Sequence, residues 1–181
     1  MKKWKTISSE LAFNNKWFKV QKDVVELPNG KIIDDYYLWN RGDVVLIVAI
    51  TKAQKIVLVR QYKHGGRDIF IEVPAGWIED GENVKIAAER ELIEETGFKS
   101  DDVKLLTILI GEPTKKIGKT YVYLAENVVK IMNQKLDENE DIEVTEYEFD
   151  EVINMIYDGK IIVPSTIAAI FLAMKEINYK I

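Results

Sequence analysis

The chain contains no cysteine and only one histidine, His64, among its 181 residues. The absence of cysteine excludes disulfides, zinc–thiolate sites and cysteine nucleophiles. A single histidine cannot form a cluster of histidine metal ligands, and it makes a Ser–His–Asp triad unattractive. The sequence also lacks the P-loop lysine motif and the G-x-S-x-G nucleophile motif. Catalysis must therefore rely on carboxylates, lysines, arginines and hydroxyls.

Long apolar runs are also missing. No segment approaches the ~18 apolar residues that a membrane-spanning helix needs, and the first residues lack the apolar centre of a secretory signal. We therefore expect a cytoplasmic protein without a membrane partner. The net charge of −5 argues against a stable nucleic-acid partner. A hydrophobic content of 47% and a charged content of 30% are typical of a globular protein.

The acidic residues are concentrated in two segments. Residues 79–98 carry seven acids against Lys85 and Arg90, and residues 137–151 carry nine acids and no base. A run of charge is usually a solvated surface. Two such clusters in one small domain leave a second interpretation open, in which they converge on hard cations that prefer oxygen ligands.

Turn signals and apolar runs predict a mixed α/β fold. A β-hairpin is expected around Pro28-Asn29-Gly30. Further strands are predicted at 44–50, 55–60, 69–73, 103–110, 120–125 and 141–149, and helices at 82–96, 151–157 and 164–178. Because strands and helices do not alternate regularly, we expect an α+β arrangement with a mixed sheet between helices.

The helix predicted at 82–96 places acids where they reduce its stability. On a helix, Glu91 and Glu95 lie about 40° apart, and Glu94 follows about 60° further round. Like charges four residues apart destabilise a helix, and acids near its C-terminus oppose the helix dipole. A cation site requires this arrangement, whereas a solvated stripe with an Arg90–Glu94 ion pair is the alternative.

An apolar strip beside these acids shifts the balance toward the cation site. The strip consists of Val84, Ala88 and Leu92. It would bury part of the acidic face, where a cation offsets the cost of removing carboxylates from water.

Residues 76–98, GWIEDGENVKIAAERELIEETGF, resemble the Nudix box G-x5-E-x7-R-E-U-x-E-E-x-G-U, in which U is aliphatic or aromatic. Every fixed position is present, namely Gly76, Glu82, Arg90, Glu91, Leu92, Glu94, Glu95, Gly97 and Phe98. Four further segments resemble the branch of the family that contains ADP-ribose pyrophosphatases. They are VPAG before the box, VRQYK at 59–63, Pro113, and the acidic stretch 137–142. Together these similarities extend over about residues 43–170.

This resemblance implies an α/β/α sandwich and hydrolysis that depends on Mg²⁺ or Mn²⁺. The reaction would cleave the diphosphate bond of ADP-ribose or a related nucleoside diphosphate sugar, giving a nucleoside monophosphate and a sugar phosphate. Two alternatives stay open. One is the same chemistry on GDP-mannose, a dinucleoside polyphosphate or a capped RNA end. The other is a non-catalytic module that senses nucleotides, although such a module would tolerate the loss of the box glutamates.

The resemblance also implies roles for particular residues. The implied metal ligands are the carbonyl of Ala75 and the carboxylates of Glu91, Glu95 and Glu140. The implied catalytic carboxylates are Glu140, Glu138 and Glu94, with Glu94 also a possible further metal ligand. Glu82 and Arg90 would orient the loop and the helix of the box.

Substrate contacts are less sharply indicated. Arg60 and Arg67 lie near positions that touch the diphosphate in the family, although both could be surface arginines. Trp17 and Tyr36 are candidates for stacking on the nucleobase, together with other aromatic residues near the N-terminus. Lys115 and Lys116 could meet a phosphate, but solvation is the favoured interpretation.

The first forty residues exceed what a compact Nudix domain needs. We expect residues 1–40 to form a β extension and residues 41–181 to form the Nudix hydrolase domain. An isolated hairpin is marginally stable in water, and the aromatic residues of this one are costly to expose. The extension is therefore predicted to contribute to the interface of a homodimer, and packing on its own domain is the alternative.

Overall fold

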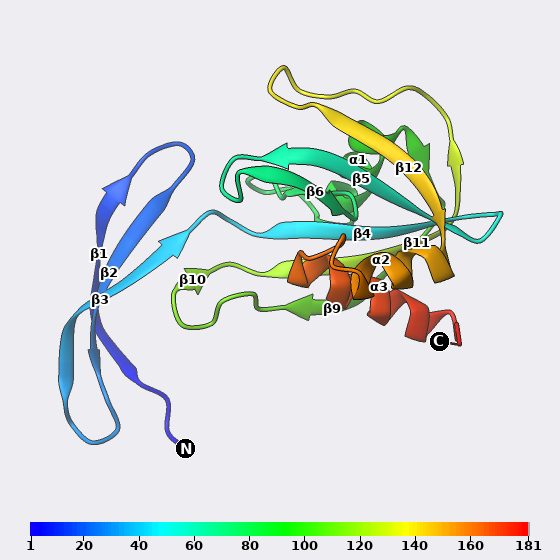
Figure 1. Cartoon of the computed structure of the whole chain (residues 1–181). Coiled ribbons are helices and arrows are strands. Elements are labelled where there is room, and N and C mark those ends of the chain that lie inside the picture. Colours follow the sequence, from blue (N-terminus) through cyan, green and yellow to red (C-terminus); the bar gives the residue numbers. More distant parts are fainter. Residues whose placement is uncertain (181) are drawn as a thin grey trace. The chain divides into compact units, whose positions relative to one another are not determined.

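The computed structural model describes residues 1–180 of the chain (Figure 1). It divides into two compact units. The first combines Met1–Asp43 with Ile110–Lys119, and the second combines Val44–Leu109 with the chain from Thr120 onward.

The first unit is a four-stranded sheet with the order β1-β2-β3-β10. Its strands are β1 (Lys5–Asn14), β2 (Lys19–Glu26), β3 (Ile32–Asn40) and β10 (Lys116–Ile117). The predicted hairpin is confirmed, because β2 and β3 pair antiparallel on either side of the turn at Gly30. Strand β1 was not predicted, since its residues show no regular alternation and all of them are exposed. Strand β10 runs parallel to β3.

The second unit is built on a mixed sheet with the central order β12-β5-β4-β11-β8. Strands β6, β7 and β9 pair with β5, β4 and β11 respectively. The bounds are β4 (Val44–Thr51), β5 (Lys55–Lys63), β6 (Asp68–Glu72), β7 (Ala75–Trp77), β8 (Phe98–Lys99), β9 (Asp102–Leu109), β11 (Thr120–Lys130) and β12 (Ile142–Glu148). Strands β4 and β11 are parallel, whereas the other pairs of this sheet are antiparallel.

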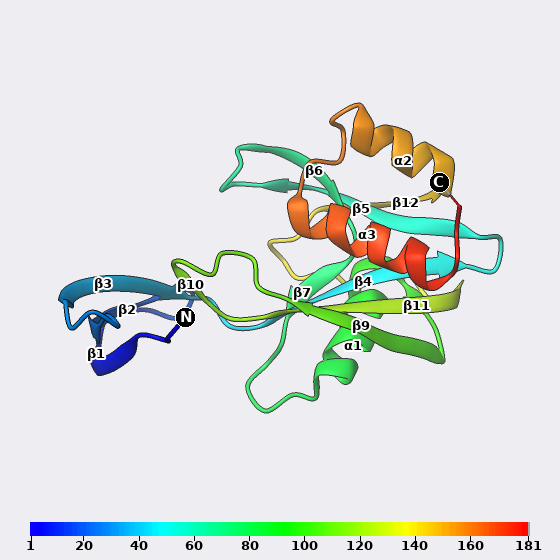
Figure 2. The ribbon, with the colours of Figure 1, turned by 90° about the horizontal axis from the view of Figure 1, so that it is seen from below.

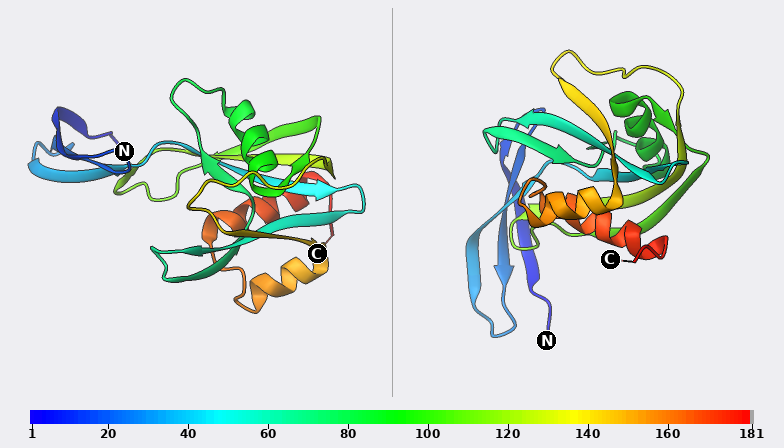
Figure 3. Two further views of the ribbon diagram at one scale, coloured as in Figure 1. Left: turned by 90° about the horizontal axis from the view of Figure 1, so that it is seen from above. Right: turned by 45° about the vertical axis from the view of Figure 1, so that its right-hand side comes forward.

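Helices cover both faces of this sheet. Helix α1 (Val84–Thr96) lies on one face, and α2 (Phe149–Tyr157) and α3 (Pro164–Glu176) lie on the other (Figures 2 and 3). Strand β4 is buried on both faces, which explains its continuous apolar run. Its odd-numbered residues, such as Ile47, pack in the cluster that contains α1, and its even-numbered residues, such as Val48, pack in the cluster with α2 and α3. The predicted α/β/α sandwich is therefore confirmed.

The ends of helix α1 are set by two residues with defined roles. The side chain of Asn83 caps its first turn by accepting from the backbone N–H of Lys85 at 2.9 Å. Gly97 ends the helix in the left-handed region at φ 74°. Of the helices in the described part of the chain, none is long and apolar enough to cross a membrane.

Candidate active site

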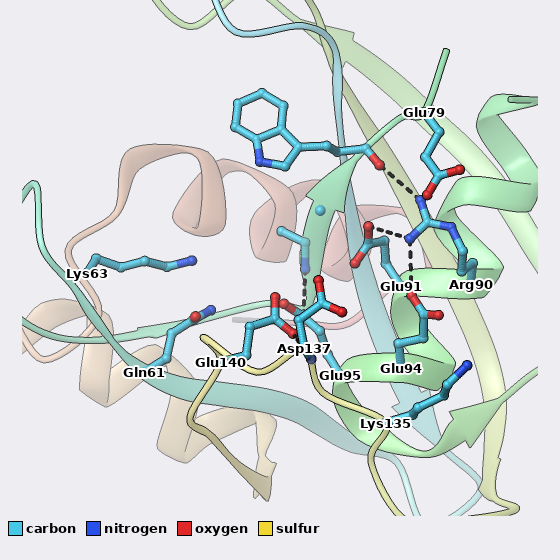
Figure 4. Close-up of a pocket in the computed structure, with 13 residues that line it drawn as sticks. Gln61, Lys63, Glu79, Arg90, Glu91, Glu94, Glu95, Lys135, Asp137 and Glu140 are labelled. Atoms are coloured by element: carbon cyan, nitrogen blue, oxygen red, sulfur yellow. Dashed lines mark hydrogen bonds and ion pairs between the residues drawn. The ribbon is translucent and has the colours of Figure 1, made fainter. Parts of the chain in front are cut away.

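A cavity of about 270 Å³ lies between α1, β5, β7 and the loop that precedes β12 (Figure 4). Carboxylates dominate its wall. They are Glu79, Glu91, Glu94, Glu95, Asp137 and Glu140. The cationic side chains in the wall are Lys63, Arg90 and Lys135. The remaining residues of the wall are Gln61, Ala75, Gly76 and Trp77.

Glu95 is the most deeply buried of these acids, with 4% of the residue exposed. Its carboxylate accepts a hydrogen bond from the backbone N–H of Ala75 at 2.9 Å, which joins α1 to β7. Burial raises the pKa of Glu95 to about 8, and the charges of Glu91 and Glu140 act in the same direction against the hydrogen bond from Ala75 and the charge of Lys63. A positive charge placed in the cavity would offset this cost.

Glu91 packs directly on the backbone of the first residue of the box. A Cβ atom built on Gly76 would lie 1.9 Å from Cδ of Glu91, so any side chain there would displace the carboxylate. Gly76 is outside the left-handed region, and the close approach is therefore the reason for glycine here. Burial raises the pKa of Glu91, although Arg90 opposes this shift.

Arg90 connects the box loop to the box helix. Its Nε and Nη2 atoms bond to the two carboxylate oxygens of Glu82, each at 2.9 Å, and Nη2 also donates to the carbonyl of Trp77 at 3.0 Å. Its Nη1 atom donates to Glu91 at 2.8 Å and to Glu94 at 3.1 Å. These contacts join the loop to the helix, as the predicted orienting role of Arg90 and Glu82 requires, and the role itself stays a prediction. The Arg90–Glu94 ion pair, considered above as an alternative to a cation site, is part of the same network.

The second acidic segment reaches the cavity through the loop before β12. Its backbone N–H at Asp137 donates to the carboxylate of Glu140, and the N–H of Glu140 donates to the carbonyl of Asp137, both at 3.0 Å. Figure 4 shows both side chains beside the carboxylates of α1. Glu138 is exposed and is not among the residues that line the cavity. The two acidic clusters of the sequence thus meet, with Glu140 as a contributor from the second.

Strand β5 presents Gln61 and Lys63 to the cavity, whereas Arg60 does not line it. Side chains alternate between the faces of a strand, and Val57 of β5 belongs to the core cluster that packs on α1. Odd-numbered residues of β5 therefore face α1. Arg60 pairs instead with Glu143, its register partner on β12, at 2.7 Å. This alternation is the sequence signal that could have identified Lys63, the last residue of VRQYK, as a residue that faces the cavity.

The other candidate substrate contacts are not among the residues that line the cavity. Arg67 occupies the turn between β5 and β6, with φ 53°, and does not line the cavity. Trp17 and Tyr36 belong to the first unit. Trp17 is 72% exposed, and Tyr36 donates its hydroxyl to the carbonyl of Thr114 at 2.5 Å.

Lys115 and Lys116 pack on aromatic rings of the first unit. The Nζ atom of Lys115 lies 4.1 Å from the ring centroid of Tyr36, and that of Lys116 lies 5.5 Å from the ring of Trp39. Both residues are half-buried. The expected solvation of these lysines is therefore only partial, because cation–π contacts hold their ammonium groups.

The cavity suits a hard cation in its chemistry. Within residues 1–180, no three acidic or histidine side chains are already arranged to hold a metal ion. Burial nevertheless raises the pKa of both Glu91 and Glu95, and the charge of Glu140 adds to both shifts. Carboxylate oxygens are the ligands that Mg²⁺ and Mn²⁺ prefer. The donor set therefore fits a divalent cation.

A carboxylate-lined cavity on the helix of an intact Nudix box, within an α/β/α sandwich, defines a Nudix hydrolase. Comparison with family models agrees: residues 40–165 match the NUDIX domain. Residues 4–39 match the nucleoside diphosphate sugar hydrolase N-terminal domain. The chain belongs to the Nudix family and is a hydrolase, and members of this family generally use divalent metal ions.

Similar proteins cover nearly the whole chain. The methanol dehydrogenase activator of Bacillus methanolicus is 34% identical over 174 residues, which are 95% of this chain and 94% of that protein. The ADP-ribose pyrophosphatase of Bacillus subtilis (strain 168) is 32% identical with the same coverage. A GDP-mannose pyrophosphatase of Yersinia enterocolitica is 30% identical and covers 88% of each chain. The solved structure of an ADP compounds hydrolase matches the fold with a TM-score of 0.84 at 24% identity, covering 99% of this chain and 98% of that one.

Proposed function

We propose that the protein hydrolyses the diphosphate bond of ADP-ribose or a related nucleoside diphosphate sugar with Mg²⁺ or Mn²⁺. The products would be a nucleoside monophosphate and a sugar phosphate. The main support for the proposal is that one cavity is lined by Glu91 and Glu95 of the box and by Glu140 of a loop distant in sequence. Relatives named ADP-ribose pyrophosphatase in Bacillus subtilis and Mycobacterium tuberculosis support the choice of substrate.

Charge balance explains why such a substrate requires a cation. A diphosphate is anionic, and the cavity wall carries more acidic than basic side chains. Glu91, Glu95 and Glu140, with the carbonyl of Ala75, would hold the ion. When bound, it supplies the positive charge that the diphosphate oxygens need. Lys63 adds a fixed positive charge from the opposite wall.

Glu140 is our candidate for the general base. Its carboxylate lines the cavity, and a base must lie within about 3 Å of the water it deprotonates. Glu138 is the alternative base if the loop rearranges when substrate binds. Glu94 is already paired with Arg90 and serves as a further candidate ligand.

We propose that Lys63, and not Arg60, contacts the diphosphate. Lys63 lies in the cavity wall, and its Nζ atom is 3.8 Å from the carboxylate of Glu72. Arg60 is engaged by Glu143. Arg67 is kept as a candidate contact for the diphosphate.

The first unit is proposed to supply the nucleobase contacts and a homodimer interface. Trp17 and Tyr36 are the candidates for stacking on the base. Strand β1 lies at the edge of its sheet and exposes Ile7, Leu11 and Phe13. An exposed edge strand with apolar side chains is a typical site for pairing with another chain. The cytoplasmic location stays a prediction from the sequence.

A panel of nucleotide sugars tests the proposal. ADP-ribose, other ADP-sugars and GDP-mannose would be incubated with the protein and Mg²⁺ or Mn²⁺, and the products would be identified by chromatography. We expect the highest kcat/KM with an ADP-sugar. GDP-mannose is the second candidate, because GDP-mannose pyrophosphatases are among the relatives. Absence of hydrolysis across the whole panel would refute the proposal.

A further inference from the structure

The loop between β11 and β12 places Asp137 and Glu140 at the cavity although residues 131–141 contain no helix or strand. Backbone hydrogen bonds attach the loop to the C-terminal end of α1. The N–H of Ile131 donates to the carbonyl of Gly97 at 2.9 Å, and the N–H of Lys135 donates to the carbonyl of Glu94 at 2.8 Å. Carbonyls at the end of a helix have no partner within the helix, so they are available for such contacts.

The side chain of Gln134 adds an attachment of a different kind. Its Nε2 atom donates to the carbonyl of Glu95 at 2.6 Å and to the carbonyl of Ile142 at 2.8 Å. A primary amide has two N–H donors, and here both are used. Glu95 carries the most buried carboxylate of the cavity, and Ile142 is the first residue of β12. One side chain therefore connects the backbone of the box helix to the far end of the acidic loop.

We propose that Gln134 is a positioning residue that holds the acidic loop in register with α1, so that Glu140 faces Glu91 and Glu95. This inference rests on the proposed function, because it assumes that those three carboxylates act on one cation and one substrate. Glu140 is separated from Gln134 by only a few residues of irregular chain. Fixing both Lys135 and Ile142 against α1 restricts where its carboxylate can lie.

Few other side chains could replace Gln134. Asparagine is one methylene shorter and does not span the two carbonyls, and glutamate has no N–H to donate when ionised. Methionine has a similar length but no donor. Substitution by methionine therefore removes both hydrogen bonds while conserving most of the packing.

The test uses the full chain with Gln134→Met and Gln134→Asn. Asn133→Ala is the matched control, because Asn133 is an exposed amide residue in the same loop. Hydrogen exchange of the metal-free protein comes first. We expect the amides of residues 135–141 to exchange at least about fivefold faster in Gln134→Met, which corresponds to the loss of a typical hydrogen bond. Exchange in β4 should stay unchanged.

Binding of Mn²⁺ alone is the second readout. Residues that support metal ligands typically change affinity by about 10–100-fold when mutated. We expect at least about tenfold weaker Mn²⁺ binding for Gln134→Met by calorimetry, and an intermediate loss for Gln134→Asn. Kinetics with Mg²⁺ and ADP-ribose are the third readout. There kcat should fall roughly 10–100-fold while KM stays within about twofold, since only the catalytic geometry changes.

These readouts separate the inference from the proposed function. If the wild-type protein hydrolyses none of the substrates, the proposed function fails, and hydrogen exchange with Mn²⁺ binding still decides whether Gln134 positions the loop. The positioning role would be overturned if the amides of residues 135–141 exchanged in Gln134→Met at the wild-type rate. It would also be overturned if they exchanged faster while the variant bound Mn²⁺ with wild-type affinity. An increase in KM as large as the loss in kcat would also overturn it, because it would indicate a general loss of the site.

Discussion

At the scale of single residues, Glu95 carries the largest electrostatic cost in the site. Its folded-state pKa of about 8 lies above the ordinary value of 4.5, chiefly because of burial. Between these values the folded chain binds more protons than the unfolded chain. The free energy of unfolding of the metal-free protein therefore decreases as the pH rises from about 4.5 to 8.

Glu95→Gln should remove this pH dependence and also remove activity. The amide oxygen can still accept from the N–H of Ala75, so the fold should persist. In EDTA at pH 8 we expect the variant to be more stable than wild type by at least about 1 kcal/mol, because one pKa unit corresponds to ~1.4 kcal/mol. Thermal unfolding at pH 6 and pH 8 measures the difference, which should be larger at pH 8.

In excess Mg²⁺, Glu95→Gln should lower kcat/KM at least about 100-fold. Mutation of residues that support a metal site typically has effects of about this size. Glu89→Gln is the matched control, because Glu89 lies on α1, pairs with Lys85 and does not line the cavity. Full turnover by Glu95→Gln would contradict the assignment of Glu95 as a ligand.

Glu140 should matter more for turnover than for binding. A base or late ligand acts mainly in the transition state. Glu140→Gln is therefore expected to lower kcat at least about 100-fold with a small change in KM, since general acid–base catalysis contributes about 10²–10⁴-fold. Glu138→Gln should have a minor effect, because Glu138 does not line the cavity. Steady-state kinetics with ADP-ribose would show the opposite pattern if the two roles are exchanged.

Glu91, Glu94 and Glu95 were predictable from the sequence, because helical spacing and the box place them on one helix. Glu140 was indicated by the resemblance of the acidic stretch 137–142, whereas Glu79 and Asp137 were missed as cavity residues. Lys63 was missed in favour of Arg60, since composition does not tell which residues of VRQYK face the helix. That information lies in the alternation of β5 relative to α1, and it requires knowledge of which face α1 covers. The contacts of Lys115 and Lys116 with aromatic rings depend on tertiary packing and carried no sequence signal.

At the scale of elements, the close approach of β7 to α1 builds the centre of the site. Strand β7 has only three residues, Ala75–Trp77, and was not among the predicted strands. Its N–H at Ala75 and the missing side chain at Gly76 accommodate two carboxylates of the helix. The fit depends on where the backbone of β7 lies. The Nudix box indicates this position only through its fixed glycine, Gly76.

Gly76→Ala should lower activity strongly while changing the free energy of unfolding little. Because Gly76 needs no positive φ and its new methyl group meets a flexible side chain, we expect a stability change within about 1 kcal/mol. The carboxylate of Glu91 must move, and a displacement of about 1 Å can cost 100-fold in rate. Gly111→Ala is the control, since a Cβ at Gly111 meets no heavy atom within 4 Å. Wild-type kcat/KM for Gly76→Ala would contradict the packing argument.

The longer strands and the helices of the second unit were predicted because their apolar patterns match their burial. Strands β1, β7, β8 and β10 were not predicted. Strand β1 is exposed along its whole length, and β8 and β10 are only two residues long. Nothing in the composition of Ile110–Lys119 indicates that it belongs with Met1–Asp43, because the pairing of β10 with β3 is set by the return of the chain.

At the scale of the whole molecule, the exposed apolar side chains of β1 predict a homodimer. Leu11 and Phe13 are 59% and 52% exposed. We expect sedimentation at micromolar concentration to give twice the mass of the chain. The double variant Leu11→Lys/Phe13→Lys should sediment as a monomer, because two charges at the edge strand oppose pairing. A monomeric wild-type protein would contradict the predicted interface.

The most direct test of the proposed hydrolysis is phosphorus NMR of ADP-ribose incubated with the protein and Mg²⁺. We expect the two diphosphate signals to be replaced by two phosphomonoester signals of equal intensity, from AMP and ribose 5-phosphate. The reaction should stop when EDTA removes the cation. Diphosphate signals that persist at high protein concentration, or release of inorganic phosphate instead of two monoesters, would contradict the proposed hydrolysis.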